Sequence, residues 1–379
     1  MIQTPYTWIE LNKHAFNHNA ATYKKIVGAE KKLAAVIKSN AYGHGIVEIA
    51  QLCQQSEHID WLCVGTLTEA LAVRAHGIIK PILVLYFIDT DPILAFEKDI
   101  SFMASDLLSL KYLNVLAAAH NNSFSIHLKI DTGMSRFGFM PHEINELIAQ
   151  LKTFKNLVIT GIYSHLAKAA SNDQQFSMQQ ETLFNTVIKQ FNDAGIFIEY
   201  KHIANSAGIT ALTHDTCNFF RLGLGLYGWW PSAANKQITQ EKYPDVKLQP
   251  VITLKTRIIQ LRTIAAGQPV GYDNTYITQR STKIAILPIG YYDGYDRRLS
   301  NKGLVMIGSE YAPVIGIVAM TVTMIDVTDC AHVAVGDEVV LLGNHEKITP
   351  SFIAESIVSF NPREILTRLN TNIARKVID

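Results

Sequence analysis

The chain has 379 residues, of which 48% are hydrophobic, and its formal net charge is +1. This length favours two domains over one, and the apolar content is sufficient for a buried core. The nearly neutral charge, with no long run of one sign, argues against a nucleic-acid partner, because phosphate binding requires a basic face. No apolar run is long enough to span a bilayer and no signal-like N-terminus is present, so we expect a cytoplasmic protein without a membrane partner.

The cysteines are scattered along the chain and form neither a CxxC pair nor a zinc-like His/Cys spacing: they are Cys53, Cys63, Cys217 and Cys330. We therefore interpret them as small hydrophobic residues in a reducing compartment. Neither disulfides nor a metal site is expected.

Apolar residues have helical spacing over residues 10–28, and strand-like runs alternate with amphipathic segments from Leu33 onward. Eight strands are expected at Leu33–Lys38, Trp61–Gly65, Ile82–Phe87, Ser101–Ala104, Ser125–Ile130, Val158–Ser164, Tyr200–Ala204 and Phe219–Leu222. Helices are expected between them, at Thr68–His76, Leu107–His120, Pro141–Thr153 and Gln174–Ala194. This alternation predicts an α/β fold, a TIM-like (β/α)8 barrel. A doubly wound open sheet is the alternative, although its usual GxGxxG fingerprint is missing.

The pattern changes near Pro231–Asp245, a polar segment with two prolines. Beyond it, strand-like runs alternate with turn residues, at Gln249–Leu261, Thr282–Leu287, Gly303–Ile307, Val314–Met320, Thr323–Val327 and Glu338–Leu342. Short helices are expected at Pro350–Ser359 and Glu364–Asn370. We predict a barrel over residues 1–240 and a mostly β domain over residues 241–379, with residues 1–9 as candidates for pairing with the second domain.

Lys38 ends the first predicted strand, directly after the apolar run from Leu33 to Ile37. Such a lysine can snorkel to solvent. Held in a partly desolvated site, its amine instead loses charge readily and becomes a carbonyl nucleophile. Tyr42, Gly43 and Gly45 follow, and they supply a hydroxyl and a permissive backbone that suit a bound phosphate.

Other polar side chains also stand at the ends of predicted strands. They are Lys129, with Asp131 to Arg136 after it, then His165, Asn205 with Ser206, and Arg221 with Gly223 and Gly225. Each alone has an ordinary structural explanation, such as a surface charge or a hydrogen-bonded core residue. In a (β/α)8 barrel, however, the carboxyl ends of all strands form one face, where functional groups gather. The sequence therefore predicts one site at this face.

Several stretches, in matching order along nearly the whole chain, resemble the alanine racemase family. The first is the family's pyridoxal-phosphate lysine motif, here Ala35-Val36-Ile37-Lys38-Ser39-Asn40-Ala41-Tyr42-Gly43-His44-Gly45. The others are Asp131-Thr132-Gly133-Met134-Ser135-Arg136, His202-Ile203-Ala204-Asn205-Ser206 and Arg221-Leu222-Gly223-Leu224-Gly225-Leu226-Tyr227-Gly228. The resemblance implies that pyridoxal 5'-phosphate is the cofactor.

The resemblance also implies roles for individual residues. Those expected at the cofactor are Lys38, Tyr42, His165, Asn205, Ser206, Arg221, Gly223 and Leu224. Arg136 would hold the substrate carboxylate and the cofactor's phenolic oxygen, supported by Lys129, which matches a lysine that is often carbamylated. Met320 would contact the substrate through its backbone amide, and Tyr291 matches a loop at the access channel.

Arg221 bears most on the reaction type. A guanidinium cannot accept a proton, so it should leave the pyridine nitrogen of the cofactor unprotonated. The weaker electron sink that results suits removal and return of the α-proton, and it discourages transamination.

Racemisation needs an acid/base group on each face of the substrate. Lys38 can serve one face. Pro269-Val270-Gly271-Tyr272-Asp273-Asn274-Thr275-Tyr276 resembles the segment whose tyrosine reaches the site of the other subunit, so Tyr272 is the second expected base. His165, Arg221 and His202 would form the hydrogen-bonded chain that tunes it. The resemblance thus implies a homodimer with shared active sites.

The sequence departs from the family at three usually charged positions of the access channel, which are Ala170, Ile317 and Thr321 here. The family's acidic and basic side chains at these positions are absent together, which is expected because a single remaining charge would lack a partner. We expect a less polar channel, and substrate choice is less firmly predicted than reaction type.

The function implied is interconversion of L- and D-alanine, which supplies D-alanine for peptidoglycan. The alternatives are a broader-specificity racemase, for example one that accepts serine, and a decarboxylase on the same scaffold. The decarboxylase is disfavoured because such relatives set a carboxylate against the pyridine. A pyridoxal-phosphate carrier or homeostasis protein would lack the β domain. A non-catalytic binding barrel is the remaining alternative.

Overall fold

The computed structural model describes residues 5–359 and 361–379. The described chain forms two compact units. The barrel unit comprises Ala15–Ser39 and Ile49–Gln249. The β unit comprises the N-terminal segment through His14, Asn40–Glu48 and Pro250–Asp379.

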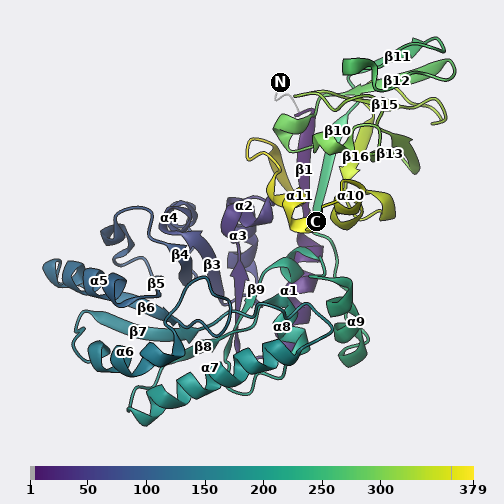
Figure 1. Cartoon of the computed structure of the whole chain (residues 1–379). Helices are drawn as coiled ribbons and strands as arrows, with labels where there is room; N and C mark the ends of the chain where they lie inside the picture. Colours follow the sequence, from purple (N-terminus) through teal and green to yellow (C-terminus); the bar gives the residue numbers. More distant parts are fainter. Residues whose placement is uncertain (1–4, 360) are drawn as a thin grey trace. The chain divides into compact units, whose positions relative to one another are not determined.

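Eight parallel strands make the sheet of the barrel unit, in the order β8-β7-β6-β5-β4-β3-β2-β9 (Figure 1). They are β2 (Lys32–Val36), β3 (Trp61–Thr66), β4 (Ile82–Phe87), β5 (Ile100–Ala104), β6 (Phe124–Lys129), β7 (Leu157–Tyr163), β8 (Tyr200–His202) and β9 (Phe219–Leu222). The first and last strands of this order approach each other, because the Asn218 N–H donates to the Lys201 carbonyl at 3.1 Å and the Arg221 N–H to the Ala204 carbonyl at 3.2 Å. The predicted barrel is confirmed, and the open doubly wound sheet was wrong.

Helices follow the strands on the outside of this sheet (Figure 1). The helices are α1 (Lys13–Val27), α3 (Ile46–Gln55), α4 (Leu67–Ala75), α5 (Leu107–Ala119), α6 (Ile144–Leu151), α7 (Gln175–Asp193), α8 (Ser206–Ala211) and α9 (Ala233–Lys242). Local capping fixes where they begin. The Thr66 hydroxyl accepts the Glu69 N–H before α4, and the Asp106 carboxylate accepts the Ser109 N–H before α5.

Aromatic rings fill part of the barrel interior. Trp61 packs against Phe219 and Tyr200, with ring centroids 5.4 Å and 5.1 Å apart, and His127 stacks on Tyr200 at 5.9 Å. His127 fits only because Gly161 faces it, since a Cβ at that glycine would lie 2.2 Å from the His127 Nδ1 atom. The interior is therefore a packed core with a buried histidine.

The β unit contains a six-stranded sheet in the order β14-β13-β16-β10-β1-β17 and a three-stranded sheet in the order β11-β12-β15. The strands are β1 (Thr7–Asn12), β10 (Ile252–Arg257), β11 (Gln260–Ile264), β12 (Thr282–Leu287), β13 (Leu304–Ile307), β14 (Glu310–Pro313), β15 (Thr323–Asp326), β16 (Glu338–Leu342) and β17 (Ala374–Ile378), followed or interrupted by the short helices α10 (Pro350–Ser356) and α11 (Pro362–Thr367). The predicted mostly β second domain is confirmed.

Some predicted elements of the β unit differ in detail. The single strand expected at Gln249–Leu261 is divided between β10 and β11. The strand expected at Val314–Met320 was wrong, because only Val314 forms an isolated bridge, to Ile325. Gly316 ends the pairing there: its φ is 72°, and a Cβ would lie 2.6 Å from the Val270 carbonyl oxygen.

The N-terminal segment carries a strand before the first helix. β1 pairs antiparallel with β10 and parallel with β17, so it lies inside the six-stranded sheet. The helix expected from residue 10 begins at Lys13 instead. Residues 1–4, part of the segment predicted to pair with the second domain, lie outside the described residues.

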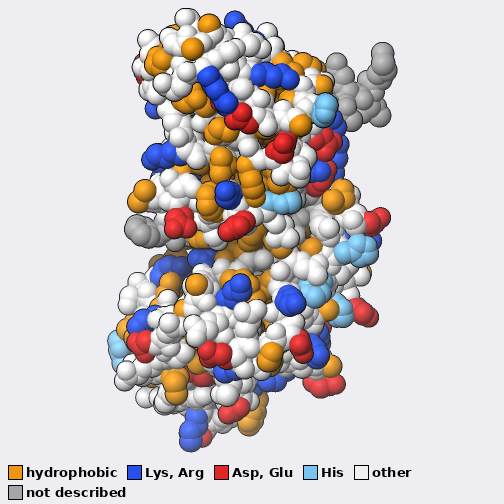
Figure 2. Space-filling view, turned by 90° about the vertical axis from the view of Figure 1, so that its right-hand side faces the viewer, with side chains coloured by type: hydrophobic (Ala, Val, Ile, Leu, Met, Phe, Trp, Pro, Cys, Tyr) orange, Lys and Arg blue, Asp and Glu red, His pale blue; other side chains and the backbone are white. Residues whose placement is uncertain are grey.

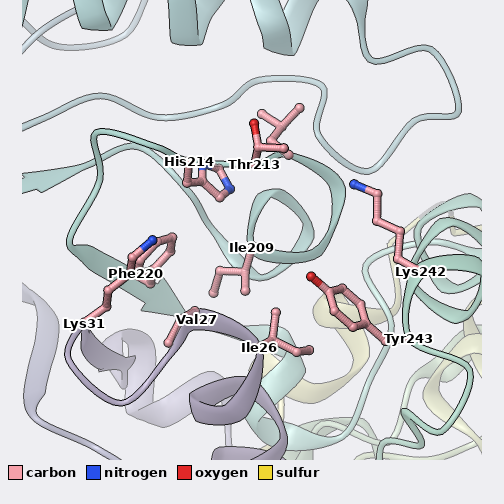
Figure 3. Close-up of a pocket in the computed structure, with 10 residues that line it drawn as sticks. Ile26, Val27, Lys31, Ile209, Thr213, His214, Phe220, Lys242 and Tyr243 are labelled. Atoms are coloured by element: carbon pink, nitrogen blue, oxygen red, sulfur yellow. The ribbon is translucent and has the colours of Figure 1, made fainter.

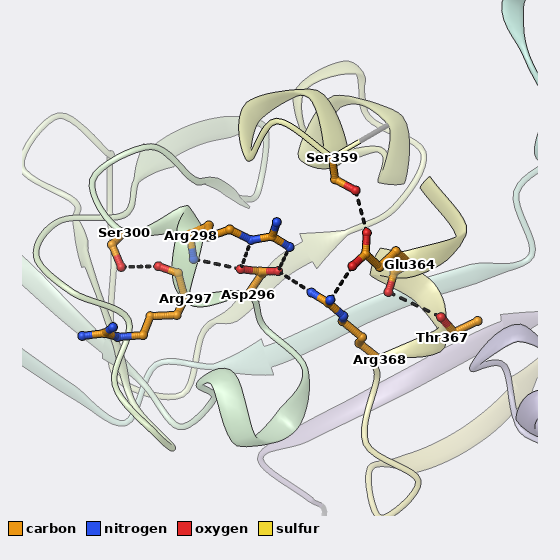
Figure 4. Close-up of polar contacts among 8 residues, drawn as sticks. All are labelled: Asp296, Arg297, Arg298, Ser300, Ser359, Glu364, Thr367 and Arg368. Carbon is orange, nitrogen blue, oxygen red and sulfur yellow. Dashed lines mark hydrogen bonds and ion pairs between the residues drawn. The ribbon is translucent and has the colours of Figure 1, made fainter. Parts of the chain in front are cut away.

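A charged network joins two parts of the β unit (Figure 4). The Asp296 carboxylate accepts two hydrogen bonds from the Arg298 guanidinium, at 3.0 and 2.7 Å, one from the Arg298 backbone N–H at 2.8 Å, and one from Arg368 at 3.0 Å. Arg368 also pairs with Glu364 of α11, whose other oxygen accepts the Ser359 hydroxyl at 2.7 Å. The loop after Tyr291 is thereby attached to the C-terminal helices.

On the face drawn in Figure 2, acidic and basic side chains are interspersed, in keeping with the net charge of +1. Within the part of the chain that the structure describes, no helix is both long and apolar enough to cross a membrane.

Candidate active site

Lys38 lies two residues beyond the end of the buried strand β2 and contacts a tyrosine from the end of β4. The Lys38 Nζ atom lies 2.7 Å from the Tyr86 hydroxyl, to which it donates, and 4.4 Å from the centre of that ring. Both side chains are partly buried. The lysine amine is thus held by a protein group at the carboxyl end of the barrel.

The chain immediately after Lys38 is strained. Residues Ser39 to Tyr42 have φ values between 51° and 55°, so this turn, α2 (Lys38–Tyr42), is left-handed. Left-handed helical residues other than glycine cost roughly 1–2 kcal/mol each. Gly43 continues with φ 84°, and a Cβ there would lie 1.9 Å from the Leu366 carbonyl oxygen of the β unit. Strain of this kind is typical of functional sites, where surrounding contacts sustain it.

Arg221, on β9, is almost fully buried. Its Nη1 atom donates to the Nδ1 of His202 at 2.6 Å, and its Nη2 donates to the carbonyls of Ser164 at 2.8 Å and Ile203 at 3.1 Å. Nη2 also lies 3.2 Å from Nδ1 of His165. Burial lowers the pKa of Arg221, but a guanidinium remains charged in proteins. None of these four partners is a carboxylate, so they leave its positive charge uncompensated.

This arginine fixes the proton positions of two histidines. Because His202 accepts at Nδ1, its proton is on Nε2, which donates to the Nδ1 of His127 at 2.9 Å. His127 therefore carries its own proton on Nε2, which has no hydrogen-bond partner among residues 5–359 and 361–379. Both rings are neutral in this arrangement.

The pKa shifts agree with that assignment. Burial, reinforced by the charge of Arg221, lowers the pKa of His127 to about 3 and the pKa values of His165 and His202 well below 6.5. Burial and then Arg221 also lower the pKa of Lys129, at the end of β6, to about 7. A considerable fraction of Lys129 is thus neutral near neutral pH.

Asp131 shapes the loop that carries Arg136. Its Oδ1 atom accepts the N–H groups of Gly133 and Met134, each at 2.8 Å, and its Oδ2 accepts the Arg136 N–H at 3.1 Å. Burial works to raise the pKa of Asp131, but these backbone hydrogen bonds lower it overall. The carboxylate is occupied by the backbone, and the loop presents Arg136 near Tyr86, with Cζ 5.3 Å from the ring centre.

Ser206, the first residue of α8, accepts hydrogen bonds from two backbone N–H groups. Its Oγ atom accepts the N–H groups of Gly223 at 2.9 Å and Gly225 at 3.2 Å. Asn205 caps α8 by accepting the N–H groups of Ala207 and Gly208, each at 3.1 Å. A phosphate oxygen could take the place of the hydroxyl as acceptor of such donors.

The charges at this end of the barrel suit an anionic ligand. After burial, the groups that lower the pKa of His165 are Arg221, Lys129, Arg136 and Lys38, and all of them are basic. The carboxylate of Asp131, which lies close to Lys129 in the sequence, accepts hydrogen bonds from backbone N–H groups. The residues present therefore fit pyridoxal phosphate, which carries a phosphate and a phenolate, and an amino-acid carboxylate.

The remaining predicted residues belong to the β unit. Tyr42 is in its Asn40–Glu48 segment, and Tyr272 begins a short turn, with 66% of its surface exposed. Tyr291 and Met320 lie on neighbouring loops, because the N–H groups of Tyr291 and Tyr292 donate to the carbonyls of Ala319 and Met320, at 3.1 and 2.9 Å. The structure thus brings Tyr291 and Met320 together, whereas the roles of all four stay predictions.

Sequence reasoning missed Tyr86 and His127. Tyr86 stands next to last in a strand that was predicted correctly, so the rule that strand ends carry function could have found it. His127 lies within β6, and only the three-dimensional packing reveals its contact with His202.

A separate cavity of about 370 Å³ lies near the opposite ends of β2 and β9 (Figure 3). Its lining includes Lys31, His214, Phe220 and Lys242, and no predicted site residue. His214 is held by Glu181 at 2.9 Å and the Gly208 carbonyl at 2.6 Å, and Lys242 donates to the Ala211 carbonyl at 2.6 Å. This end of a barrel usually serves stability.

Comparison with known proteins gives one consistent family. Residues 11–231 match the family model described as "Alanine racemase, N-terminal domain", and residues 251–377 match "Alanine racemase, C-terminal domain". The chain is 36% identical over 373 residues to "Alanine racemase 2" of Caldanaerobacter subterraneus subsp. tengcongensis, covering 97% of this chain and 94% of that protein. It is 37% identical over 372 residues to the alanine racemase of Carboxydothermus hydrogenoformans, covering 97% and 98% of the two.

Solved structures agree. The alanine racemase of Clostridium difficile 630 matches with a TM-score of 0.92 at 29% identity, covering 99% of this chain and 96% of that one. The alanine racemase from Bartonella henselae with covalently bound pyridoxal phosphate matches with a TM-score of 0.84 at 28% identity, covering 99% and 100%.

Proposed function

Because the chain belongs to the alanine racemase family, we propose that it interconverts L- and D-alanine with pyridoxal phosphate, and that this reaction supplies D-alanine for peptidoglycan. One observation in particular supports a reaction of this type. Arg221, the cation expected at the pyridine, is buried, and none of its four hydrogen-bond partners within residues 5–359 and 361–379 is a carboxylate.

We assign the cofactor to the barrel residues already described. Lys38 would hold it covalently, while Ser206 and the backbone at Gly223 and Leu224 would face its phosphate. When bound, pyridoxal phosphate withdraws electrons from the α-carbon of the amino acid and so acidifies the α-proton. Arg136 would bind the carboxylate of the substrate and hold it in register.

The proton transfers fall to Lys38 and Tyr272 in this proposal. Lys38 moves a proton at its Nζ atom on one face of the substrate, and Tyr272 moves one at its hydroxyl on the other. Tyr272 would act from the second subunit of a homodimer, in which each site combines residues of both chains. His165 and His202 are held neutral beside Arg221, so the adjoining chain of groups carries positive charge only on the arginine.

A broader substrate range is the second candidate. Ala170, Ile317 and Thr321 stand where the family usually has charged side chains, and a less polar channel would admit larger amino acids. An alanine-specific racemase and a broader-specificity racemase are distinguished by comparing the rates at which the enzyme racemises alanine and serine offered together. Faster racemisation of serine would exclude the alanine assignment and leave the racemase class intact.

Covalent attachment of the cofactor tests the proposal. Purified protein is mixed with pyridoxal phosphate, reduced with borohydride and digested, and the modified peptide is identified by mass spectrometry. We expect modification at Lys38 and loss of this modification in Lys38→Ala. The control variant is Lys32→Ala, at the first residue of β2, in which modification of Lys38 should be normal. Protein that remains unmodified at Lys38 would contradict the proposal.

A further inference from the structure

Tyr86 has a position that none of the proposed roles explains. Its hydroxyl accepts the hydrogen bond of the Lys38 amine at 2.7 Å. Its ring packs against the rings of Phe87 and Phe137, with centroids 5.9 and 6.0 Å away. Gly65 lies beside both members of the pair, because a Cβ there would be 3.6 Å from the Lys38 Cβ and 3.7 Å from the Tyr86 Cδ2. The ring and the amine are therefore packed as a pair at the end of the barrel.

The pair can share one proton in two ways. A phenolate beside an ammonium and a phenol beside a neutral amine contain the same number of protons. Only the second state presents the Lys38 lone pair, and a lysine must be neutral to attack a carbonyl carbon. A base next to a nucleophile is a general means of activation.

The charged groups around Tyr86 favour its phenolate. Burial works to raise the pKa of Tyr86, but the charge and hydrogen bond of Lys38, followed by Arg136 and Arg221, lower it overall. Tyr86 therefore gives up its own proton more readily than an ordinary tyrosine, and only the resulting phenolate can take a proton from the Lys38 ammonium.

Two other acidic groups near the pair, Glu69 and Tyr163, are hydrogen-bonded elsewhere. The Glu69 carboxylate accepts the N–H groups of Ser39 and Gly65, each at 2.7 Å. Tyr163 donates its hydroxyl to the Leu85 carbonyl at 3.2 Å, and burial raises its pKa. Of these groups, Tyr86 is the one hydrogen-bonded to the Lys38 amine.

We propose that Tyr86 is a further catalytic residue, which takes a proton from the Lys38 ammonium and so frees the amine for attack on the carbonyl carbon of the cofactor. In this step an N–H bond of Lys38 breaks, an O–H bond of Tyr86 forms, and the electron pair of the broken bond stays on Nζ. No electrons are exchanged with another reagent. The inference rests on the proposed covalent role of Lys38.

The test is the rate at which the cofactor-free, full-length enzyme attaches pyridoxal phosphate. Samples are reduced with borohydride at successive times and at several pH values, and modified Lys38 is quantified by mass spectrometry. In Tyr86→Phe we expect attachment to slow by about 100-fold at neutral pH, the lower end of the range for a positioned acid or base. The deficit should shrink as the pH rises, because solvent then removes the lysine proton.

The control is Tyr112→Phe, at an exposed tyrosine of α5, which should attach cofactor at the wild-type rate. Thermal unfolding of Tyr86→Phe should match wild type, because the phenylalanine keeps the ring packing. Attachment by Tyr86→Phe at the wild-type rate and with the wild-type pH dependence would overturn the role of Tyr86 alone. Failure of the wild type to attach cofactor would instead overturn the proposed function, and this inference with it.

Discussion

Acid should destabilise this protein through its buried histidines, and a His127→Gln variant should lose a defined part of that effect. The folded-state pKa of His127 is about 3, whereas a histidine in an unfolded chain has a pKa of about 6.5. Below about pH 6.5, His127 therefore binds a proton in the unfolded chain but stays unprotonated in the folded barrel. The free energy of unfolding consequently falls as the pH drops from there toward 3.

The size of the effect follows from the two pKa values. One pH unit between them corresponds to about 1.4 kcal/mol, so His127 alone should remove about 2 kcal/mol of stability between pH 7 and pH 5. At pH 5 the folded ring is still neutral, so this figure depends little on the precise folded pKa. A glutamine side chain at this position would not titrate, yet its amide oxygen could still accept the hydrogen bond from His202.

The assay is guanidinium unfolding of the cofactor-free protein at both pH values, followed by circular dichroism. Contributions from the other histidines, including buried His44 of the β unit, are common to both proteins and cancel in the comparison. The variant should lose about 2 kcal/mol less than wild type on acidification. If the free energy of unfolding falls equally in both proteins, His127 is not a histidine that stays neutral in the folded state.

Two further substitutions test other parts of the account. Tyr272→Phe should reduce racemase turnover by about 100-fold or more while cofactor attachment remains normal, whereas Tyr311→Phe in the same unit should change neither; unchanged turnover would exclude Tyr272 as a base. Gly161→Ala should lower the stability of the barrel by about 1–3 kcal/mol in calorimetry, because its Cβ would lie 2.2 Å from the His127 ring. Gly343→Ala is the matched control, because a Cβ there would have its nearest neighbour at 3.4 Å. Equal losses of stability in both variants would show that the contact between the new Cβ and His127 does not destabilise the barrel.

The eight barrel strands could be predicted because each is a short apolar run between amphipathic segments. All eight lie within two residues of their expected bounds at both ends, and Ile82–Phe87 and Phe219–Leu222 match them without any difference. Once a barrel is expected, strand ends identify Lys38 and Arg221 as neighbours without further information. That reasoning needs only the alternating order of the elements.

Features that depend on contacts between distant segments could not be predicted in the same way. The sequence predicts that residues 1–9 pair with the second domain, but it does not predict β17 as the parallel partner of β1, because that strand at the opposite end of the chain has no distinctive pattern. The left-handed turn after Lys38 occurs in non-glycine residues, for which local preferences predict the opposite hand. The placement of the domain boundary at residue 240 and the roles of the site residues stay predictions.

The most direct test of the central claim is incubation of the loaded enzyme with L-alanine in deuterated water. Exchange of the α-proton through two protein groups predicts D-alanine that carries deuterium at the α-carbon, detected by chiral chromatography with mass spectrometry. Absence of D-alanine, or D-alanine that retains only hydrogen at that carbon, would contradict racemisation by solvent-exchangeable bases.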